Sequence, residues 1–201
     1  IAAKYSDTVC LSVGLHSGYG AAQCMYVKRG YIPDGSGVWY GGKVCPEYED
    51  CCHDDELELF SDVGTQKFIS DANDGLMTKH GGEYIKDAFE HEQYLIITES
   101  ITRLLITGCS HKGIVNIMEQ YHRIHGKDVI RLFSVIGGFH LYNPTKKEYA
   151  SKEFISALAE SLDRFRVHYY TCHCTGIKAF NYLSSRLKNL HYFSCGDTID
   201  I

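Results

Sequence analysis

A regular alternation of strand-type and helix-type periodicity begins near Tyr94 and constrains the fold more than any other feature of the sequence. Tyr94–Thr98 and Ile101–Thr107 are strand-type runs separated by Glu99-Ser100, which predicts a hairpin. Three further strands are predicted over Val129–Ile136, Val167–Tyr170 and His191–Phe193.

Apolar residues at helical spacing fill the segments between these strands. They predict helices that begin near Lys112, Ser151 and Gly176, and Gly126 is a credible end for the first of them. Because strands that alternate with helices form βαβ units, the pattern predicts an α/β fold with a mixed sheet whose C-terminal part is parallel.

The segment before Tyr94 has weak periodicity and is rich in glycine, cysteine and charge. Glycines mark turns around Val38–Tyr40, and Cys45–Asp55 is predicted to be an exposed acidic loop. No repeat or low-complexity linker divides the chain, so residues 1–201 are expected to form a single domain.

Composition excludes several classes of protein. Hydrophobic residues make up 44% and charged residues 22% of the 201 positions, which is typical of a globular chain. The formal net charge of −5 argues against a nucleic-acid or anionic-membrane partner. No apolar run approaches the ~20 residues of a membrane helix. The chain has nine cysteines, an odd number, and its sequence shows no export signal. We therefore expect reduced thiols and a cytoplasmic protein.

Three histidine-containing clusters follow three predicted strands. They are Thr107–His111 (TGCSH), Gly137–His140 (GGFH) and Cys172–Gly176 (CHCTG). Because ligands of α/β sheets bind beyond the carboxyl ends of the strands, these clusters predict a shared metal site. Imidazole suits zinc, iron and manganese, and a bound metal activates water near neutral pH.

Cysteines leave two alternatives open. Cys109, Cys172 and Cys174 are either thiolate ligands or small residues that pack strand ends. Cys45, Cys51, Cys52 and His53 are either a structural zinc site or part of a solvated acidic loop. The aromatic pair Trp39-Tyr40 is interpreted as packing rather than as a substrate platform.

Four ordered motifs carry a resemblance to a known family. Asp87–Ile97 (DAFEHEQYLII), Leu104–Asn116 (LLITGCSHKGIVN), Val135–Leu141 (VIGGFHL) and Cys172–Gly176 resemble one subgroup of the metallo-β-lactamase-fold hydrolases. Members of that subgroup are similar to a dihydropterin-condensing synthase of methanopterin biosynthesis. The resemblance covers roughly residues 87–176, and residues 1–86 match only loosely.

The resemblance implies an αββα sandwich with a metal centre at one edge, often binuclear. The family's H-x-H-x-D-H motif is absent, because no two histidines here are separated by one residue. We therefore expect the chain to be the C-terminal part of such a domain, incomplete at its N-terminus, with a degenerate relative as the alternative.

Residue by residue, the resemblance implies that His111 and His173 are metal ligands. His140, Lys112, Ser110, Cys109 and Thr175 are expected to contact the substrate or to support the ligands. Many relatives have a bridging carboxylate after the motif glycine, whereas Gly108 is followed here by Cys109.

The expected chemistry is hydrolysis of an ester, phosphoester or related bond by metal-activated water. The metal is expected to be zinc, with manganese or iron as alternatives. The substrate is a small molecule, and Lys112 at a helix N-terminus favours an anionic one. The alternatives are a non-catalytic metal-binding module of the same fold, a pterin-pathway condensing activity, and an oxygen- or nitric-oxide-reducing di-iron protein, which needs a flavin domain.

Overall fold

The computed structural model describes residues 20–31, 39–40, 43–44, 51–53, 57–64, 67–126, 128 and 130–199. The chain falls into two compact units, Ile1–Trp39 and Tyr40–Ile201, and each is described by itself. In the first unit, helix α1 (Gly20–Lys28) is followed by a turn that brings the rings of Tyr26 and Tyr31 into edge contact. Two-residue strands β1 (Trp39–Tyr40) and β2 (Lys43–Val44) form a small separate sheet.

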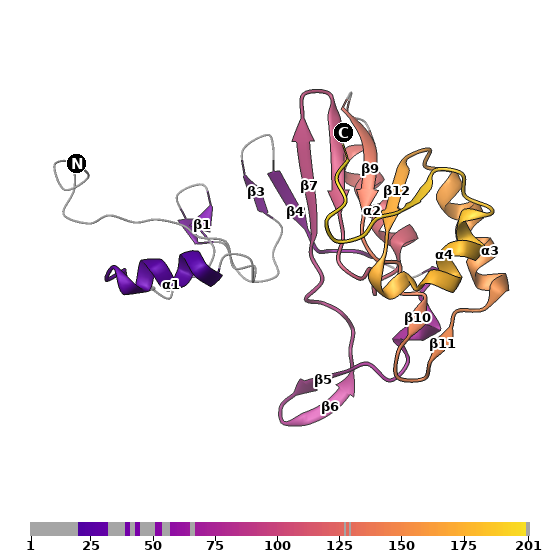
Figure 1. The fold of residues 1–201 in the computed structure, drawn as a ribbon, viewed down its shortest axis with the longest axis horizontal. Helices are drawn as coiled ribbons and strands as arrows, with labels where there is room; N and C mark the ends of the chain where they lie inside the picture. The colour runs from indigo at the N-terminus through magenta and orange to yellow at the C-terminus, as the bar shows by residue number, and fades with distance from the viewer. Residues whose placement is uncertain are drawn as a thin grey trace. The chain divides into compact units, whose positions relative to one another are not determined.

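A seven-stranded sheet is the framework of the second unit (Figure 1). Its spatial order is β13-β12-β9-β8-β7-β4-β3. Strands β3, β4, β7 and β8 pair antiparallel, and β8, β9, β12 and β13 pair parallel. The bounds of the strands are β3 Cys51–His53, β4 Leu57–Phe60, β7 Tyr94–Glu99, β8 Thr102–Ile106, β9 Arg131–Ile136, β12 His168–Thr171 and β13 Leu190–Tyr192. The predicted mixed sheet with a parallel C-terminal part, and the β7–β8 hairpin, are confirmed.

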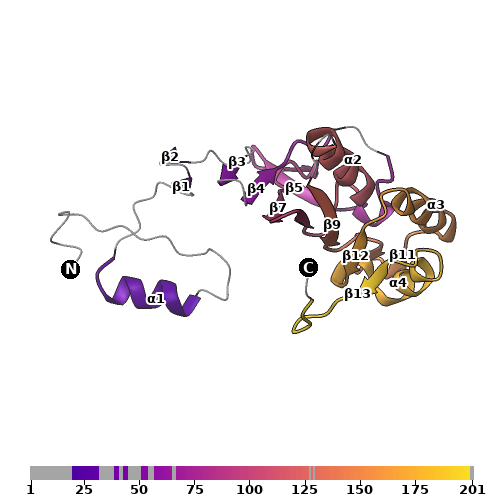
Figure 2. The same ribbon diagram turned by 90° about the horizontal axis from the view of Figure 1, so that it is seen from above.

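Three helices cover one face of this sheet (Figure 2). They are α2 (Ile114–His125), α3 (Lys152–Asp163) and α4 (Ile177–Ser184), and all three begin within two residues of the predicted positions. Alternate strand residues such as Ile96, Leu105 and Val135 are fully buried against them. Alternation arises because successive side chains of a strand point to opposite faces.

Helix α3 begins at a side-chain cap. The Ser151 hydroxyl accepts a hydrogen bond from the Phe154 backbone N–H at 3.1 Å. We expect Ser151→Ala to lower the free energy of unfolding by about 1 kcal/mol, because one helix-end donor loses its acceptor. Urea unfolding measures this, with the exposed Ser194→Ala as a matched control. Equal midpoints for the two variants would show that the cap contributes nothing.

Several elements before residue 94 and after residue 140 were not predicted. Helix α1 is one of them, and β3 and β4 extend the sheet on its antiparallel side. Two small hairpins are added, β5 (Met77–His80) with β6 (Glu83–Lys86), and β10 (Tyr142–Asn143) with β11 (Glu148–Tyr149). A short 3-10 helix, η3 (Asp71–Asn73), precedes the first hairpin and contributes to the site described below.

A charged cluster joins β8 to the loop after α2. Arg103 Nη1 donates to Asp128 Oδ2 at 2.7 Å, and His125 lies 3.0 Å from the same carboxylate oxygen and 3.2 Å from Glu58 Oε1. Arg103, and then His125, hold the pKa of the Asp128 carboxyl below its ordinary value.

This lowered pKa has a consequence for acid stability. The Asp128 pairing stabilises the fold above the carboxyl's unfolded pKa of about 4 and is lost as pH falls through the lower folded-state pKa. Asp128→Asn is therefore expected to melt below the wild type at about pH 7, with the two melting temperatures converging toward about pH 3. A difference that stays constant across this range would contradict the assignment.

Five cysteines among the described residues, Cys24, Cys109, Cys172, Cys174 and Cys195, are free thiols. The proposed zinc cluster at Cys45, Cys51, Cys52 and His53 lies outside the side chains that the structure describes, as do those of Trp39 and Tyr40. None of the described helices has the length and apolar character to cross a membrane.

Candidate metal centre

Three loops meet at the carboxyl-end edge of the parallel strands β8, β9 and β12. Backbone hydrogen bonds tie them together: Gly138 N donates to Gly108 O at 2.9 Å, and Gly137 N donates to Tyr170 O at 3.0 Å. Leu141 N donates to Cys174 O at 3.0 Å. The three predicted clusters are therefore neighbours, each at the end of its strand.

The backbone of these loops adopts the left-handed region at non-glycine residues. Ser110, His140 and His173 have φ values of 57°, 44° and 52°. Such conformations are costly for residues with a side chain and persist where the surrounding structure imposes them, which is typical of functional sites. Two of the three candidate histidines are thus held in strained conformations.

His111 is fixed in orientation and in tautomer. Its ring stacks on Phe89 with centroids 4.3 Å apart and planes 3° apart. Asn73 Nδ2 donates to the His111 carbonyl at 2.8 Å, so Asn73 Oδ1 faces His111 Nδ1, also at 2.8 Å. Because Oδ1 only accepts, Nδ1 carries the proton and Nε2 keeps its lone pair. A histidine held in this way is prepared to bind a metal through Nε2.

His140 lies beside His111, with ring centroids 4.0 Å apart. It is 6% exposed, and its Nε2 donates to the Ala72 carbonyl at 3.3 Å. Its buried Nδ1 makes no hydrogen bond to any residue that the structure describes. A buried nitrogen without a partner is costly unless a metal or a ligand satisfies it, and this atom therefore fits the implied metal.

The Cys109 thiol lies at the centre of the cluster. Its Sγ is 3.7 Å from His173 Nδ1, and Cys174 Sγ is 3.7 Å from the Cys109 carbonyl oxygen. The Cys174 thiol, and then the neighbouring rings of His111 and His140, lower the pKa of the Cys109 thiol. Donation to Cys109, together with burial, raises the pKa of Cys174. Cys109 is therefore the more acidic thiol of this pair.

Glu92 holds the backbone of the His111 loop in place through hydrogen bonds. Its carboxylate accepts the backbone N–H of His111 at 2.8 Å, that of Lys112 at 3.0 Å and the phenol of Tyr94 at 2.8 Å. Burial, and then the neighbouring Glu92 charge, raise the pKa of Tyr94, so the phenol remains a donor. The N–H groups before α2 thus already face an anion of the protein itself.

The other predicted site residues occupy supporting positions. The Ser110 hydroxyl is buried and lies 2.9 Å from Thr107 Oγ1. Thr175 Oγ1 is buried, accepts from Phe139 N at 2.9 Å and pairs with Thr171 Oγ1. The Lys112 side chain is half-buried, and its role toward a substrate stays a prediction.

Sequence reasoning missed Phe89, Asn73 and Glu92. Phe89 and Glu92 lie inside the resembling stretch Asp87–Ile97, so the resemblance marked their segment without marking their role. Asn73 lies in a part of the chain with little periodicity, and no sequence signal connects it to His111.

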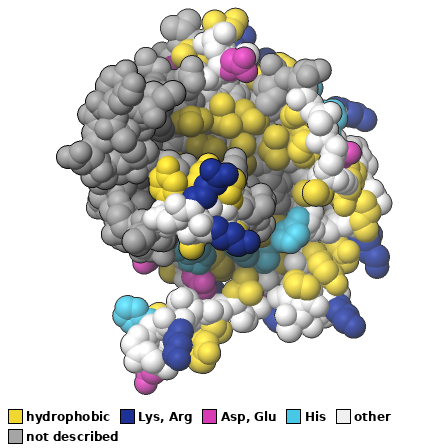
Figure 3. All heavy atoms as spheres, turned by 60° about the vertical axis from the view of Figure 1, so that its left-hand side comes forward, with side chains coloured by type: hydrophobic (Ala, Val, Ile, Leu, Met, Phe, Trp, Pro, Cys, Tyr) yellow, Lys and Arg dark blue, Asp and Glu magenta, His cyan; other side chains and the backbone are white. Residues whose placement is uncertain are grey.

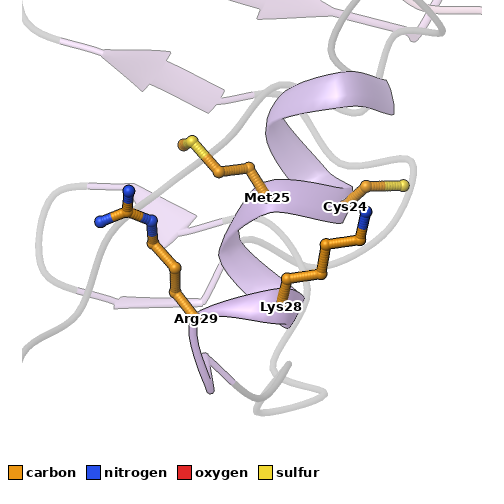
Figure 4. A pocket seen from close by; sticks show the side chains of 4 residues that line it. All are labelled: Cys24, Met25, Lys28 and Arg29. Carbon is orange, nitrogen blue, oxygen red and sulfur yellow. The ribbon is translucent and has the colours of Figure 1, made fainter.

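Imidazole nitrogens and thiolate sulfurs together suit zinc better than magnesium or manganese. The donor set gathered at this edge therefore fits the metal that the resemblance implies. Two hollows elsewhere among the described residues have different linings. One in the first unit is lined by Cys24, Met25 and Lys28 of α1 and by Arg29, which follows the helix (Figure 4). One in the second unit is lined by Glu119, His122, Arg164 and Phe165.

The fold is that of the metal-dependent hydrolases of the β-lactamase superfamily. The chain superposes on the crystal structure of one such hydrolase with a TM-score of 0.57 and 24% identity, over 79% of this chain and 58% of that one. The predicted α/β fold class is thereby confirmed. In the part of the chain that the structure describes, this fold consists of the seven-stranded sheet and the helices α2–α4.

Two curated proteins of Methanocaldococcus jannaschii are similar in sequence. One is a 7,8-dihydropterin-6-methyl-4-(beta-D-ribofuranosyl)-aminobenzene-5'-phosphate synthase, 33% identical over 115 residues, which are 57% of this chain and 36% of the synthase. The other is an uncharacterized protein, 32% identical over 120 residues, 60% of this chain and 41% of that protein. The chain thus spans about two fifths of the length of these relatives. The subgroup resemblance is confirmed, and no family model matches the chain.

Proposed function

We propose that this chain carries the metal-binding edge of a metal-dependent hydrolase that acts on an ester, phosphoester or related bond. The observation that carries the proposal is the gathering of His111, His140 and His173 around Cys109, at the carboxyl ends of three parallel strands of a β-lactamase-type fold. The superposition on a metal-dependent hydrolase of the β-lactamase superfamily supports the proposal.

In this proposal His111 and His173 hold the metal, which supplies Lewis acidity and activates water when bound. His111 presents Nε2 because Asn73 holds the proton on Nδ1, and Glu92 fixes the backbone beneath it. His140 directs its unpartnered Nδ1 toward the metal or the substrate. The Lys112 ammonium attracts a small anionic substrate. For the whole protein, we also propose a second metal at this site and a cytoplasmic location.

The test measures metal content and turnover on the same samples. The chain is loaded with zinc, manganese or iron, and hydrolysis of an aryl phosphodiester and an aryl ester is followed with and without chelator. We expect metal-dependent turnover in the wild type, a loss of about 100-fold or more in His111→Ala and His173→Ala, and wild-type behaviour in His80→Ala, an exposed histidine of β5. Turnover that survives both site substitutions would overturn the proposal.

A second candidate rests on the 33% identity to the pterin-pathway synthase. In that case the amine of an aminobenzene ribosyl phosphate displaces a leaving group from the 6-methyl carbon of a dihydropterin and loses a proton, and the Lys112 ammonium binds the phosphate. Incubation with both reactants separates the two candidates. A coupled product without aryl ester hydrolysis supports the synthase, and hydrolysis without a coupled product supports the hydrolase.

A further inference from the structure

A thiol pair shares the strand edge with the imidazoles. Cys109, His173 and Cys174 each offer one donor atom, and the three donor atoms lie within 4.8 Å of one another. We propose that these residues form a three-ligand thiolate–imidazole site that binds zinc. The site shares His173 with the proposed hydrolytic centre, but it requires no turnover and adds two ligands that the resemblance does not supply.

The distance between the Cys109 sulfur and the His173 nitrogen matches that of a tetrahedral zinc site. Zinc binds thiolate sulfur at about 2.3 Å and imidazole nitrogen at about 2.0–2.1 Å, so a sulfur and a nitrogen on one zinc lie roughly 3.6 Å apart. Cys109 Sγ and His173 Nδ1 are 3.7 Å apart. The two side chains therefore accept the metal between them with little movement.

The backbone brings the remaining donor to the same place. Cys172 is extended, with φ −157° and ψ −153°, and the 3-10 turn η4 (His173–Thr175) follows at once. This turn directs the neighbouring residues His173 and Cys174 toward the Cys109 loop, where Cys174 Sγ approaches the Cys109 carbonyl. Gly138 leaves the space that the Cys174 sulfur occupies, because a Cβ at that position would overlap it.

A second observation points to a ligand at this place. His140 is 94% buried, its Nδ1 lacks a hydrogen-bond partner among the described residues, and its ring centroid lies 4.0 Å from that of His111, in the loop that follows Cys109. A metal bound beside Cys109 would give His140 Nδ1 a partner, either directly or through a bound water.

The donor set also determines which metal binds. Metal binding releases the thiol protons, and two thiolates with one imidazole favour zinc over the harder manganese and magnesium ions. Three protein ligands leave the fourth position of a tetrahedral zinc open, as in catalytic rather than structural sites.

X-ray absorption spectroscopy of the zinc-loaded wild-type chain identifies the ligand atoms directly. This measurement does not depend on whether a variant folds. We expect a mixed shell of two sulfur atoms at about 2.3 Å and one imidazole nitrogen at about 2.0–2.1 Å. A shell of nitrogen and oxygen alone overturns the proposal. So does a Cys109–Cys174 disulfide in the chain purified under reducing conditions, because it removes both thiolates.

Variants assign the sulfurs to residues. Competition with a chelating dye is expected to show zinc bound about 100-fold more weakly by Cys109→Ser and by Cys174→Ser. The cobalt-loaded forms of both variants are expected to lose thiolate-to-cobalt absorption. Cys172→Ser is the matched control, since Cys172 adjoins His173 in sequence but lies outside the three-donor group. An equal loss in Cys172→Ser and Cys109→Ser overturns the assignment.

Failure of this inference is distinguishable from failure of the proposed function. Sulfur-bound zinc without metal-dependent hydrolysis overturns the hydrolase proposal alone. Metal-dependent hydrolysis by a zinc bound only through nitrogen and oxygen overturns the thiolate site alone.

Discussion

Glu92→Ala is expected to lower the free energy of unfolding by about 3 kcal/mol. Three donors lose their acceptor in this variant: the backbone N–H groups of His111 and Lys112, and the buried phenol of Tyr94. A buried donor left without a partner costs about 1–3 kcal/mol, and water that enters the vacated space offsets part of the sum. Urea unfolding followed by circular dichroism measures the change.

Two further variants make this expectation specific. Glu92→Gln keeps one carbonyl acceptor in place and is expected to lose less than Glu92→Ala. Glu90→Ala removes an exposed carboxylate two residues away and is expected to shift the midpoint hardly at all. If Glu92→Ala unfolded at the same urea concentration as Glu90→Ala, the carboxylate would not be the support that we assign to it.

Gly138→Ala is expected to weaken zinc binding by about 100-fold while leaving most of the fold's stability intact. The added Cβ overlaps the Cys174 sulfur, which is the end of a short side chain and escapes by rotation. Rotation separates Cys174 from Cys109 and disperses the three-donor group, whereas the strands beneath need not move. Zinc competition and urea unfolding on the same preparation separate the two effects.

Gly108→Ala is the matched control for this substitution. Gly108 lies in the neighbouring loop, and a Cβ there meets no atom within 4 Å. We expect wild-type zinc affinity in Gly108→Ala. Wild-type affinity in Gly138→Ala as well would mean that the position of the Cys174 sulfur does not matter for metal binding.

Periodicity predicted the part of the fold that positions the candidate site. Alternating apolar residues such as Ile96, Leu105 and Val135 are buried under the helices, and that burial is what the pattern encodes. Parallel pairing of β8, β9 and β12 then follows, and with it the meeting of the three histidine clusters at one edge.

Contacts across long stretches of sequence were not predictable in the same way. Asn73 reaches His111 from a short 3-10 helix in a segment without a regular pattern, and Glu92 meets His111 through a side-chain contact to backbone. No periodic sequence pattern encodes either contact, because each depends on how a loop folds back onto the sheet. The proximity of Cys109 and Cys174 is of the same kind, so the sequence left the role of these thiols open.

Exposed apolar side chains on the sheet affect how the protein behaves at high concentration. Apolar side chains on the sheet remain partly exposed, among them Leu57 at 37% and Phe133 at 43%. Figure 3 shows a face of the molecule on which hydrophobic side chains gather. Contiguous apolar surface promotes association, so we expect the chain to self-associate at high concentration.

The loops that carry Cys109 and His173 are far apart in the sequence, and this separation determines when the metal site forms during folding. Cys109 and His173 are 64 residues apart, and they meet only after β8, β9 and β12 have paired in parallel. Parallel pairing closes long loops and is slow compared with helix formation. Zinc uptake during refolding would therefore lag behind the recovery of helical signal, and the metal would serve as a reporter of the last steps of assembly.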